Sequence, residues 1–142
     1  MAKRTILFSQ AENEAIRQAM RDDPTMILMG EDVAGGAGRA HLGVEDAWGG
    51  AMGSTKGLIQ EFGPRRVWDT PICEMSFLGA AVGAAMTGLR PLVDFAFVNL
   101  IGSALDPLMN QAASLRYMLG GQVSVPLTLR AVIGTLTWPP SM

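Results

Sequence analysis

A chain of 142 residues is expected to form one domain with a substantial core, because domains average about 100–200 residues. An apolar fraction of 49% excludes an intrinsically disordered chain, and a net charge of −2 provides no basic surface for nucleic acid. The single cysteine, Cys73, excludes a disulfide framework and a zinc site built from cysteines, and it fits a reducing compartment.

The N-terminal region predicts a helix followed by a buried strand. Residues 9–12 read Ser-Gln-Ala-Glu, a capping-box pattern that is typical of a helix start. Apolar side chains then recur at helical spacing: Ala15, Ile16, Ala19 and Met20. We expect the helix to end at the Asp-Asp-Pro sequence of residues 22–24 and the apolar run 26–29 to form a short strand.

Residues 30–63 hold ten of the 17 glycines, so we predict that most of this segment is loop. The glycine-rich run 35–38 invites a dinucleotide-binding interpretation, but His41 replaces the third glycine of that fingerprint. His41 is the only histidine and has no evident Ser or Cys partner, so we expect a surface residue. A short helix is predicted over residues 55–62, with Gly63 as its left-handed cap.

The remaining chain alternates predicted strands and helices. Strands are expected over residues 66–69, 92–98 and 125–133, and helices over residues 74–87 and in a long segment that ends near Leu119. This alternation predicts an α/β fold with a mainly parallel sheet that is covered by helices on both faces.

Charge is distributed unevenly along the chain. Only five charged side chains follow Met75: Arg90, Asp94, Asp106, Arg116 and Arg130. The longest uncharged run among them, residues 75–89, is shorter than the roughly 18–20 residues that span a bilayer. The N-terminus also lacks the apolar stretch of a secretory signal. We therefore expect a cytoplasmic protein, away from the membrane, whose charge-poor half is covered by other protein.

Two features of the segment 74–87 point to function. Gly79, Ala80, Gly83 and Ala84 form one smooth helix face, which either packs tightly inside the domain or meets another subunit or a cofactor. Glu74 begins this apolar helix. Its carboxylate either complements the helix dipole or, because burial disfavours an ionised acid, takes part in proton chemistry.

Four stretches carry a resemblance to a known family: MGEDVAGGAG (29–38), TKGLIQEFGPRRVWDTPICE (55–74), GAAVGAAMTGLRP (79–91) and NQAASLRYMLGGQVSVPLTLR (110–130). Over about residues 5–134 the chain resembles the beta subunit of the thiamin-diphosphate-dependent, decarboxylating component of 2-oxo acid dehydrogenase complexes. The loop EDAWGG (45–50) looks most like acetoin-type or generic bacterial 2-oxo acid members.

The resemblance implies a transketolase-like pyrimidine-binding domain and roles for particular residues. Glu74 is similar to the glutamate that hydrogen-bonds the aminopyrimidine ring of thiamin diphosphate, the cofactor that acts as electron sink during decarboxylation. Ile72 and Leu100 would lie against that ring. The backbone carbonyl of Leu127, together with Thr128, would bind a structural monovalent cation such as potassium.

The resemblance also implies partners. An alpha subunit would hold the cofactor's diphosphate and magnesium, a second beta subunit would complete a heterotetramer, and a lipoyl-bearing acyltransferase core would accept the acyl group. We find no motif for the diphosphate or for magnesium in this chain. Which 2-oxo acid is used, or whether acetoin is, does not follow from these residues.

Three departures from the family set further expectations. Leu100 stands where relatives usually carry an aromatic ring, and Asp106-Pro107 replaces Asp-Gln, so Pro107 either distorts a helix or begins a new one that Asp106 caps. The likeness stops after Gly134, and residues 135–142 fit nothing in the family. We therefore expect residues 1–142 to be a truncated pyrimidine-binding domain, without the C-terminal domain of its relatives.

A truncated domain leaves alternatives open. The chain either contributes its glutamate to a thiamin-diphosphate-dependent enzyme or is a non-catalytic remnant that keeps the fold without binding cofactor. A flavodoxin-like binding module is a third interpretation, favoured only by the alternation of strands and helices. Expressed alone, the chain is expected to be inactive and to self-associate through its uncovered apolar faces.

Overall fold

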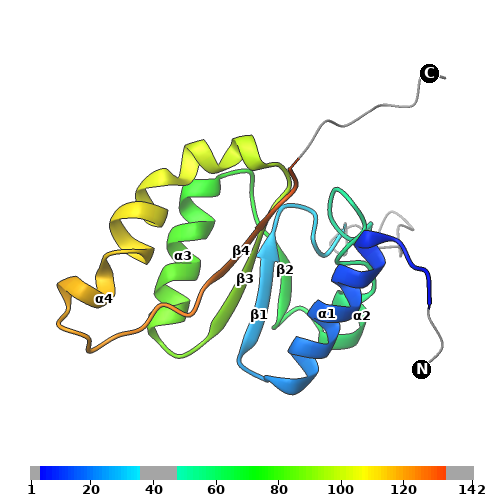
Figure 1. Cartoon of the computed structure of the whole chain (residues 1–142), viewed down its shortest axis with the longest axis horizontal. Coiled ribbons are helices and arrows are strands. Elements are labelled where there is room, and N and C mark those ends of the chain that lie inside the picture. The colour runs from blue at the N-terminus through cyan, green and yellow to red at the C-terminus, as the bar shows by residue number, and fades with distance from the viewer. Residues whose placement is uncertain (1–3, 36–47, 134–142) are drawn as a thin grey trace.

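The computed structural model describes residues 4–35 and 48–133, which form an α/β fold around a four-stranded parallel sheet (Figure 1). The strands are β1 (Met26–Gly30), β2 (Val67–Asp69), β3 (Arg90–Phe95) and β4 (Thr128–Ala131), in the spatial order β2-β1-β3-β4. Every neighbouring pair is parallel, so the predicted sheet is confirmed. His41 and residues 135–142 lie outside the described residues.

Helices cover both faces of this sheet, as the alternation predicted (Figure 1). On one face lie α1 (Phe8–Asp22) and α2 (Leu58–Phe62), which enclose a core with Met20, Leu28, Leu58 and Val67. On the other lie α3 (Glu74–Met86), a 3₁₀ helix (Val98–Ala104), a π-helical segment (Pro107–Ala112) and α4 (Leu115–Met118). Their core includes Phe77, Leu78, Val93 and Phe95. None of the helices described is long and apolar enough to cross a membrane.

The order of the strands creates a switch point between β1 and β3. From β1 the chain moves to β2 on one side, and α3 then carries it back across β1 to β3 on the other side. In open parallel sheets, ligands bind outside the carboxyl ends of the strands at such a point. Glu31 directly follows β1, Glu74 begins the helix after β2, and Phe97 follows β3. The fold thus gathers these side chains at one edge of the sheet.

Strands β1 and β3 approach each other closely at this edge. Gly30 pairs with Asp94, and a Cβ built on Gly30 would lie 2.4 Å from the Asp94 backbone oxygen. Because that neighbour is backbone and cannot move aside cheaply, only glycine fits at the end of β1.

Helix α1 begins two residues earlier than the capping-box pattern predicted. Leu7 is the N-cap, and its backbone N–H donates to Oε1 of Gln10 at 2.9 Å. Gln10 therefore takes the position that the pattern assigned to Glu12. The Glu12 carboxylate is instead bound by Arg130, 118 residues away, which explains why the local pattern misplaced the helix start.

The predicted long helix ending near Leu119 is broken into shorter pieces. Asp106 is the N-cap of the π-helical segment and Pro107 its first residue, as the second alternative expected, but the Asp106 backbone is already helical (φ −60°, ψ −58°) and its side chain makes no cap hydrogen bond. Its carboxylate instead accepts hydrogen bonds from Asn110 and Gln111. Pro107 has no backbone N–H, and its ring would clash with the preceding turn of a regular α-helix. At this residue the helix becomes the wider π-helical segment.

The glycines of α3 do not serve tight packing inside this domain. A Cβ on Gly79 or Gly83 would meet no other atom within 4 Å outside the helix itself. The inward side of α3 is made by larger residues instead: Phe77, Leu78, Ala81, Val82 and Ala85. The small-residue face of α3 was expected either to pack tightly inside the domain or to meet another subunit or a cofactor. For Gly79 and Gly83, packing inside the domain is wrong.

Candidate functional site at the carboxyl edge of the sheet

Glu74 is buried at the carboxyl edge of the sheet. The turn after β2 leads directly into α3, and Glu74 is the first residue of that helix and only 9% exposed. The hydroxyl of Ser103, on the 3₁₀ helix, lies 3.2 Å from Oε2 of Glu74. The acid that the sequence singled out thus sits within the protein, where a carboxyl group can hold or release a proton away from bulk water.

A second carboxyl group, Glu31, lies at the same edge. Its Oε1 atom is buried and has no hydrogen-bond partner among the described residues. Burial raises the pKa of Glu31, and the negative charges of Glu74 and Asp32 raise it further. Glu31 was not predicted from the sequence, although an acid directly after a buried strand is the signal that would have identified it.

Replacing Glu31 with Gln is expected to stabilise the protein at neutral pH. A carboxyl whose pKa is raised by folding binds more protons in the folded state, so stability falls as pH rises from about 4.5, the unfolded value, through the raised one. A neutral amide does not suffer this loss. Urea unfolding at pH 7 and pH 4 should therefore show the gain of Glu31→Gln at pH 7 and its disappearance at pH 4.

Glu61→Gln is the control of opposite sign. The hydrogen bond from Arg21, together with that from Arg17, lowers the pKa of Glu61, so its ionised form stabilises the folded state above the unfolded value and this contribution is lost on acidification. Glu61→Gln should destabilise at pH 7 and become neutral at low pH. If Glu31→Gln also destabilised at pH 7, the burial of an unpaired acid at this edge would be contradicted.

A cavity of about 500 Å³ opens beside Glu31. It is lined by residues that follow β1 and β3 and by the loop before α2: Glu31, Asp32, Trp48, Gly50, Ala51, Gly53, Ala96 and Phe97. This volume lies within the usual range of small-molecule sites. Leu100 stands where relatives usually carry an aromatic ring. In this chain Phe97, three residues earlier, provides an aromatic ring in the lining of the cavity.

The other residues implied by the resemblance fall in two places. Ile72 lies two residues before Glu74 and is 83% exposed, and Leu100 is half-buried against the core of the α3 face. Leu127 and Thr128 lie at the opposite edge, because Thr128 starts β4 and pairs with Leu92 near the start of β3. Leu127 and Thr128 are therefore not part of the site at Glu74. The monovalent cation there stays a prediction, and no cluster of His, Cys, Asp and Glu suited to a metal occurs among the described residues.

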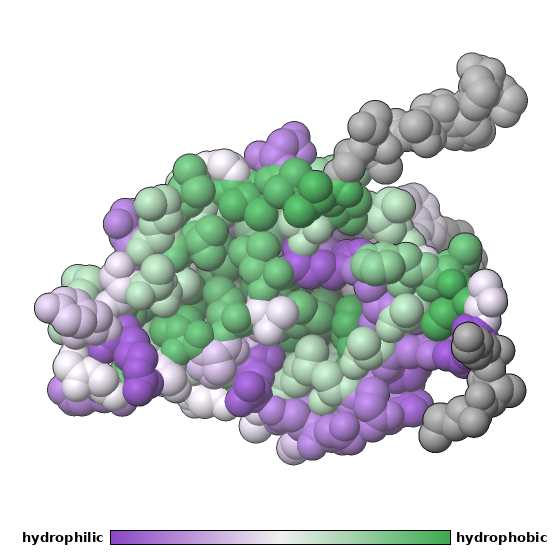
Figure 2. All heavy atoms as spheres, in the orientation of Figure 1, coloured by the Kyte–Doolittle hydropathy of each residue, from purple (hydrophilic) through white to green (hydrophobic). Residues whose placement is uncertain are grey.

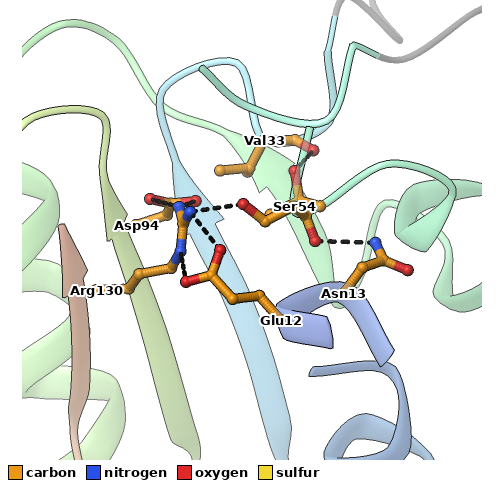
Figure 3. A network of polar contacts seen from close by, with 7 residues as sticks. Glu12, Asn13, Val33, Ser54, Asp94 and Arg130 are labelled. Atoms are coloured by element: carbon orange, nitrogen blue, oxygen red, sulfur yellow. Dashed lines mark hydrogen bonds and ion pairs between the residues drawn. The ribbon is translucent and has the colours of Figure 1, made fainter. Parts of the chain in front are cut away.

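A charged network next to the carboxyl edge ties both halves of the chain together (Figure 3). Arg130 of β4 donates from one nitrogen to both oxygens of Asp94 at 2.7 Å and from another to Glu12 of α1 at 2.9 Å. It also donates to the hydroxyl of Ser54 at 2.5 Å. Asn13 anchors the same loop by donating to the Ser54 backbone oxygen at 2.8 Å.

The two carboxylates of this network respond differently to their surroundings. Asp94 is only 4% exposed, and this burial raises its pKa against the opposing effect of Arg130. Glu12 is less buried, and the hydrogen bond from Arg130 lowers its pKa. Arg130, Asp94 and Glu12 were not selected as a group by the sequence analysis.

Comparisons with known proteins show the family of the chain. Residues 4–141 match the family described as transketolase, pyrimidine binding domain. The chain is 53% identical to the beta subunit of acetoin:2,6-dichlorophenolindophenol oxidoreductase from Bacillus subtilis (strain 168), covering 92% of the chain and 38% of that relative. The corresponding beta subunit from Cupriavidus necator is 46% identical over the same shares.

A pyruvate-type relative is also similar. The beta subunit of the pyruvate dehydrogenase E1 component from Rhizobium meliloti is 42% identical, covering 92% of this chain and 26% of the relative. The chain thus spans less than half the length of the relatives it matches. From its parallel sheet, its edge carboxyls and these matches, we conclude that the chain belongs to the transketolase pyrimidine-binding domain family.

Proposed function

We propose that the chain acts as part of the beta subunit of a thiamin-diphosphate-dependent dehydrogenase that uses acetoin or a 2-oxo acid. In this proposal Glu74 binds the aminopyrimidine ring of the cofactor. The observation that carries it is the position of Glu74, which is buried at the first residue of α3 and lies at the switch point of the sheet. Thiamin diphosphate, when bound, supplies an electron sink for the bond-breaking step.

The polar groups at the carboxyl edge suit an aminopyrimidine. Such a ring offers nitrogen acceptors and an amino donor, and this edge holds the Glu74 carboxyl and Oε1 of Glu31, which has no hydrogen-bond partner in the part of the chain that the structure describes. An unpartnered buried oxygen is unfavourable until a ligand or another group meets it. Exposed Ile72 and the ring of Phe97 provide apolar surface nearby.

The chemistry expected of this chain is the movement of one proton. The Glu74 carboxyl can give its proton to a ring nitrogen and take it back, because it is shielded from water. Burial, together with the negative charges of Glu74 and Asp32, raises the pKa of Glu31, so Glu31 releases its proton less readily than an exposed glutamate. Helix α3, packed against β3, keeps the carboxyl in place.

The partners belong to the proposal as well. An alpha subunit would bring the diphosphate and magnesium sites, and a second beta subunit would cover the open Gly79–Gly83 face of α3. Figure 2 shows apolar residues spread over the side of the molecule that carries β4 and its neighbouring helices. Leu105, Met109 and Ile133 are among the exposed apolar side chains of the described residues. A lipoyl-bearing acyltransferase core would accept the product, a monovalent cation would bind at Leu127 and Thr128, and the protein would be cytoplasmic.

Cofactor titration of an assembled complex tests the proposal. The chain is co-expressed with the alpha subunit of its own organism, and thiamin diphosphate with magnesium is added in a calorimeter. We expect saturable binding that neither the chain nor the alpha subunit shows alone. Assembly without cofactor binding would favour the non-catalytic remnant, and the absence of any complex would contradict the proposed role in a beta subunit.

A further inference from the structure

The hydroxyl group of Ser103 lies between two acceptors from different parts of the fold. Its Oγ atom is 2.7 Å from the backbone oxygen of Leu100, one 3₁₀ turn earlier, and 3.2 Å from Oε2 of Glu74 on α3. A hydroxyl has one proton to donate and two lone pairs to accept with. Ser103 therefore cannot donate to both acceptors fully at the same time.

The Ser103 hydroxyl can form a hydrogen bond with Glu74 whether the Glu74 carboxyl is ionised or protonated. When Glu74 is ionised, Oε2 can only accept, and the Ser103 proton is shared between Glu74 and Leu100. When Glu74 is protonated, the acid can donate to Oγ of Ser103 while Ser103 donates to the Leu100 oxygen. In the second state Oε2 of Glu74, Oγ of Ser103 and the Leu100 oxygen each have a partner, and in the first state the charged carboxylate accepts a hydrogen bond.

We propose that Ser103 is a positioning residue that holds the Glu74 carboxyl in both protonation states by turning its hydroxyl between Glu74 and the Leu100 carbonyl. The catalytic meaning of this arrangement rests on the proposed function, whereas the contact itself does not. Ser103 would bind no substrate or cofactor and would act only through Glu74.

The neighbours of Ser103 fix the position of its 3₁₀ helix, although the Ser103 side chain is itself exposed. The next residue, Ala104, is completely buried, and it shares a core with Phe77 and Leu78 of α3. Leu100 and Ile101 pack against the same core from the other end of the 3₁₀ helix. The helix that carries Ser103 is thus seated on the helix that carries Glu74. A serine that only hydrogen-bonds the backbone of its own preceding turn does not require its helix to pack against a second helix.

Ser114 provides a matched control for this ordinary bond. Its hydroxyl donates to the backbone oxygen of Met109 at 3.0 Å, and no carboxylate is described beside it. Ser114→Ala removes a bond from a serine to a backbone oxygen shortly before it in the chain, and Ser103→Ala removes the same kind of bond together with the contact to Glu74.

A double-mutant cycle in the 142-residue chain tests the contact without any cofactor. Unfolding equilibria are measured for the parent, Ser103→Ala, Glu74→Met and the double variant. Ser103→Ala should lower the folded-to-unfolded ratio about fivefold in the parent and clearly less in the Glu74→Met background, where residue 74 has no oxygen to accept the hydrogen bond. Ser114→Ala should have the same effect in both. Equal effects of Ser103→Ala in the two backgrounds would overturn the proposal.

A second experiment asks whether the contact serves proton transfer. In the complex with the alpha subunit, the exchange of the thiazolium C2 proton of saturating thiamin diphosphate is timed in D₂O. Ser103→Ala should slow this exchange about tenfold with little change in cofactor affinity, and Ser103→Thr, which keeps the hydroxyl, should restore it.

The outcomes of the two experiments separate the two proposals. A parent complex that binds no cofactor speaks against the proposed function, and the double-mutant cycle then decides alone on the contact. If the C2 proton exchanged equally fast in the parent complex and in the Ser103→Ala complex, the positioning role would be overturned, even if the double-mutant cycle showed coupling between Ser103 and Glu74.

Discussion

Replacing Arg130 with Met should destabilise the folded chain by about 3–5 kcal/mol, because it leaves buried charge without a partner. Arg130 donates to both oxygens of Asp94, which is only 4% exposed, and to both oxygens of Glu12. Removing a cation from such a group is far more harmful than removing an exposed ion pair, which contributes about 0–1 kcal/mol. A loss of this size is a large part of a typical total stability of about 5–15 kcal/mol.

Two further variants identify the cause of this loss. In Arg130→Met with Asp94→Asn, the buried carboxylate is replaced by a neutral amide, so part of the stability should return. Arg65→Met removes an exposed arginine and should change stability by no more than about 0.5 kcal/mol. Comparing these three variants shows whether the loss of stability in Arg130→Met comes from the uncompensated charge of Asp94 or only from the removal of an arginine.

Pulse proteolysis in urea measures these differences at low protein concentration, where self-association through exposed apolar surface is reduced. The readout is the shift of the unfolding midpoint for each variant. An Arg130→Met midpoint close to that of Arg65→Met would show that the network of Glu12, Asp94 and Arg130 contributes little to the fold.

The network also shows where prediction from the sequence stops. Short apolar runs alternating with helical patterns were sufficient to predict the parallel sheet, the helices on both faces and the burial of Leu28, Leu92 and Val93. These are local patterns. The pairing of Glu12 with Arg130 joins residues 118 positions apart, and no local pattern in either segment marks it. Glu12, which the local pattern assigned to the capping box of α1, is instead bound in this pairing.

The candidate site was predicted in part for a similar reason. Glu74 was singled out because it precedes an uncharged helix and because the segment resembles a known family. Glu31 and Phe97 were missed because their meaning depends on the strand order, which brings the ends of β1 and β3 together. Ser103 was missed because its distance to Glu74 depends on how the 3₁₀ helix is seated on α3.

Replacing Glu74 with Gln in the assembled complex should leave the fold intact and slow exchange of the cofactor's C2 proton by at least about a hundredfold. Gln has nearly the same shape as Glu and can still accept a hydrogen bond from Ser103 at this position, so packing at the start of α3 is preserved. An amide, however, cannot give a proton to a ring nitrogen and take it back. The predicted loss therefore concerns proton transfer and not binding.

Exchange is followed by quenching samples in acid and observing the C2 proton signal by NMR, and cofactor affinity is measured on the same preparations. Glu14→Gln, which changes an exposed glutamate on α1, should exchange like the parent. If Glu74→Gln bound thiamin diphosphate and exchanged as fast as Glu14→Gln, Glu74 would have no part in the proton transfer. If its affinity collapsed while the unfolding midpoint stayed constant, Glu74 would instead act mainly in binding, which the buried position of its carboxyl also permits.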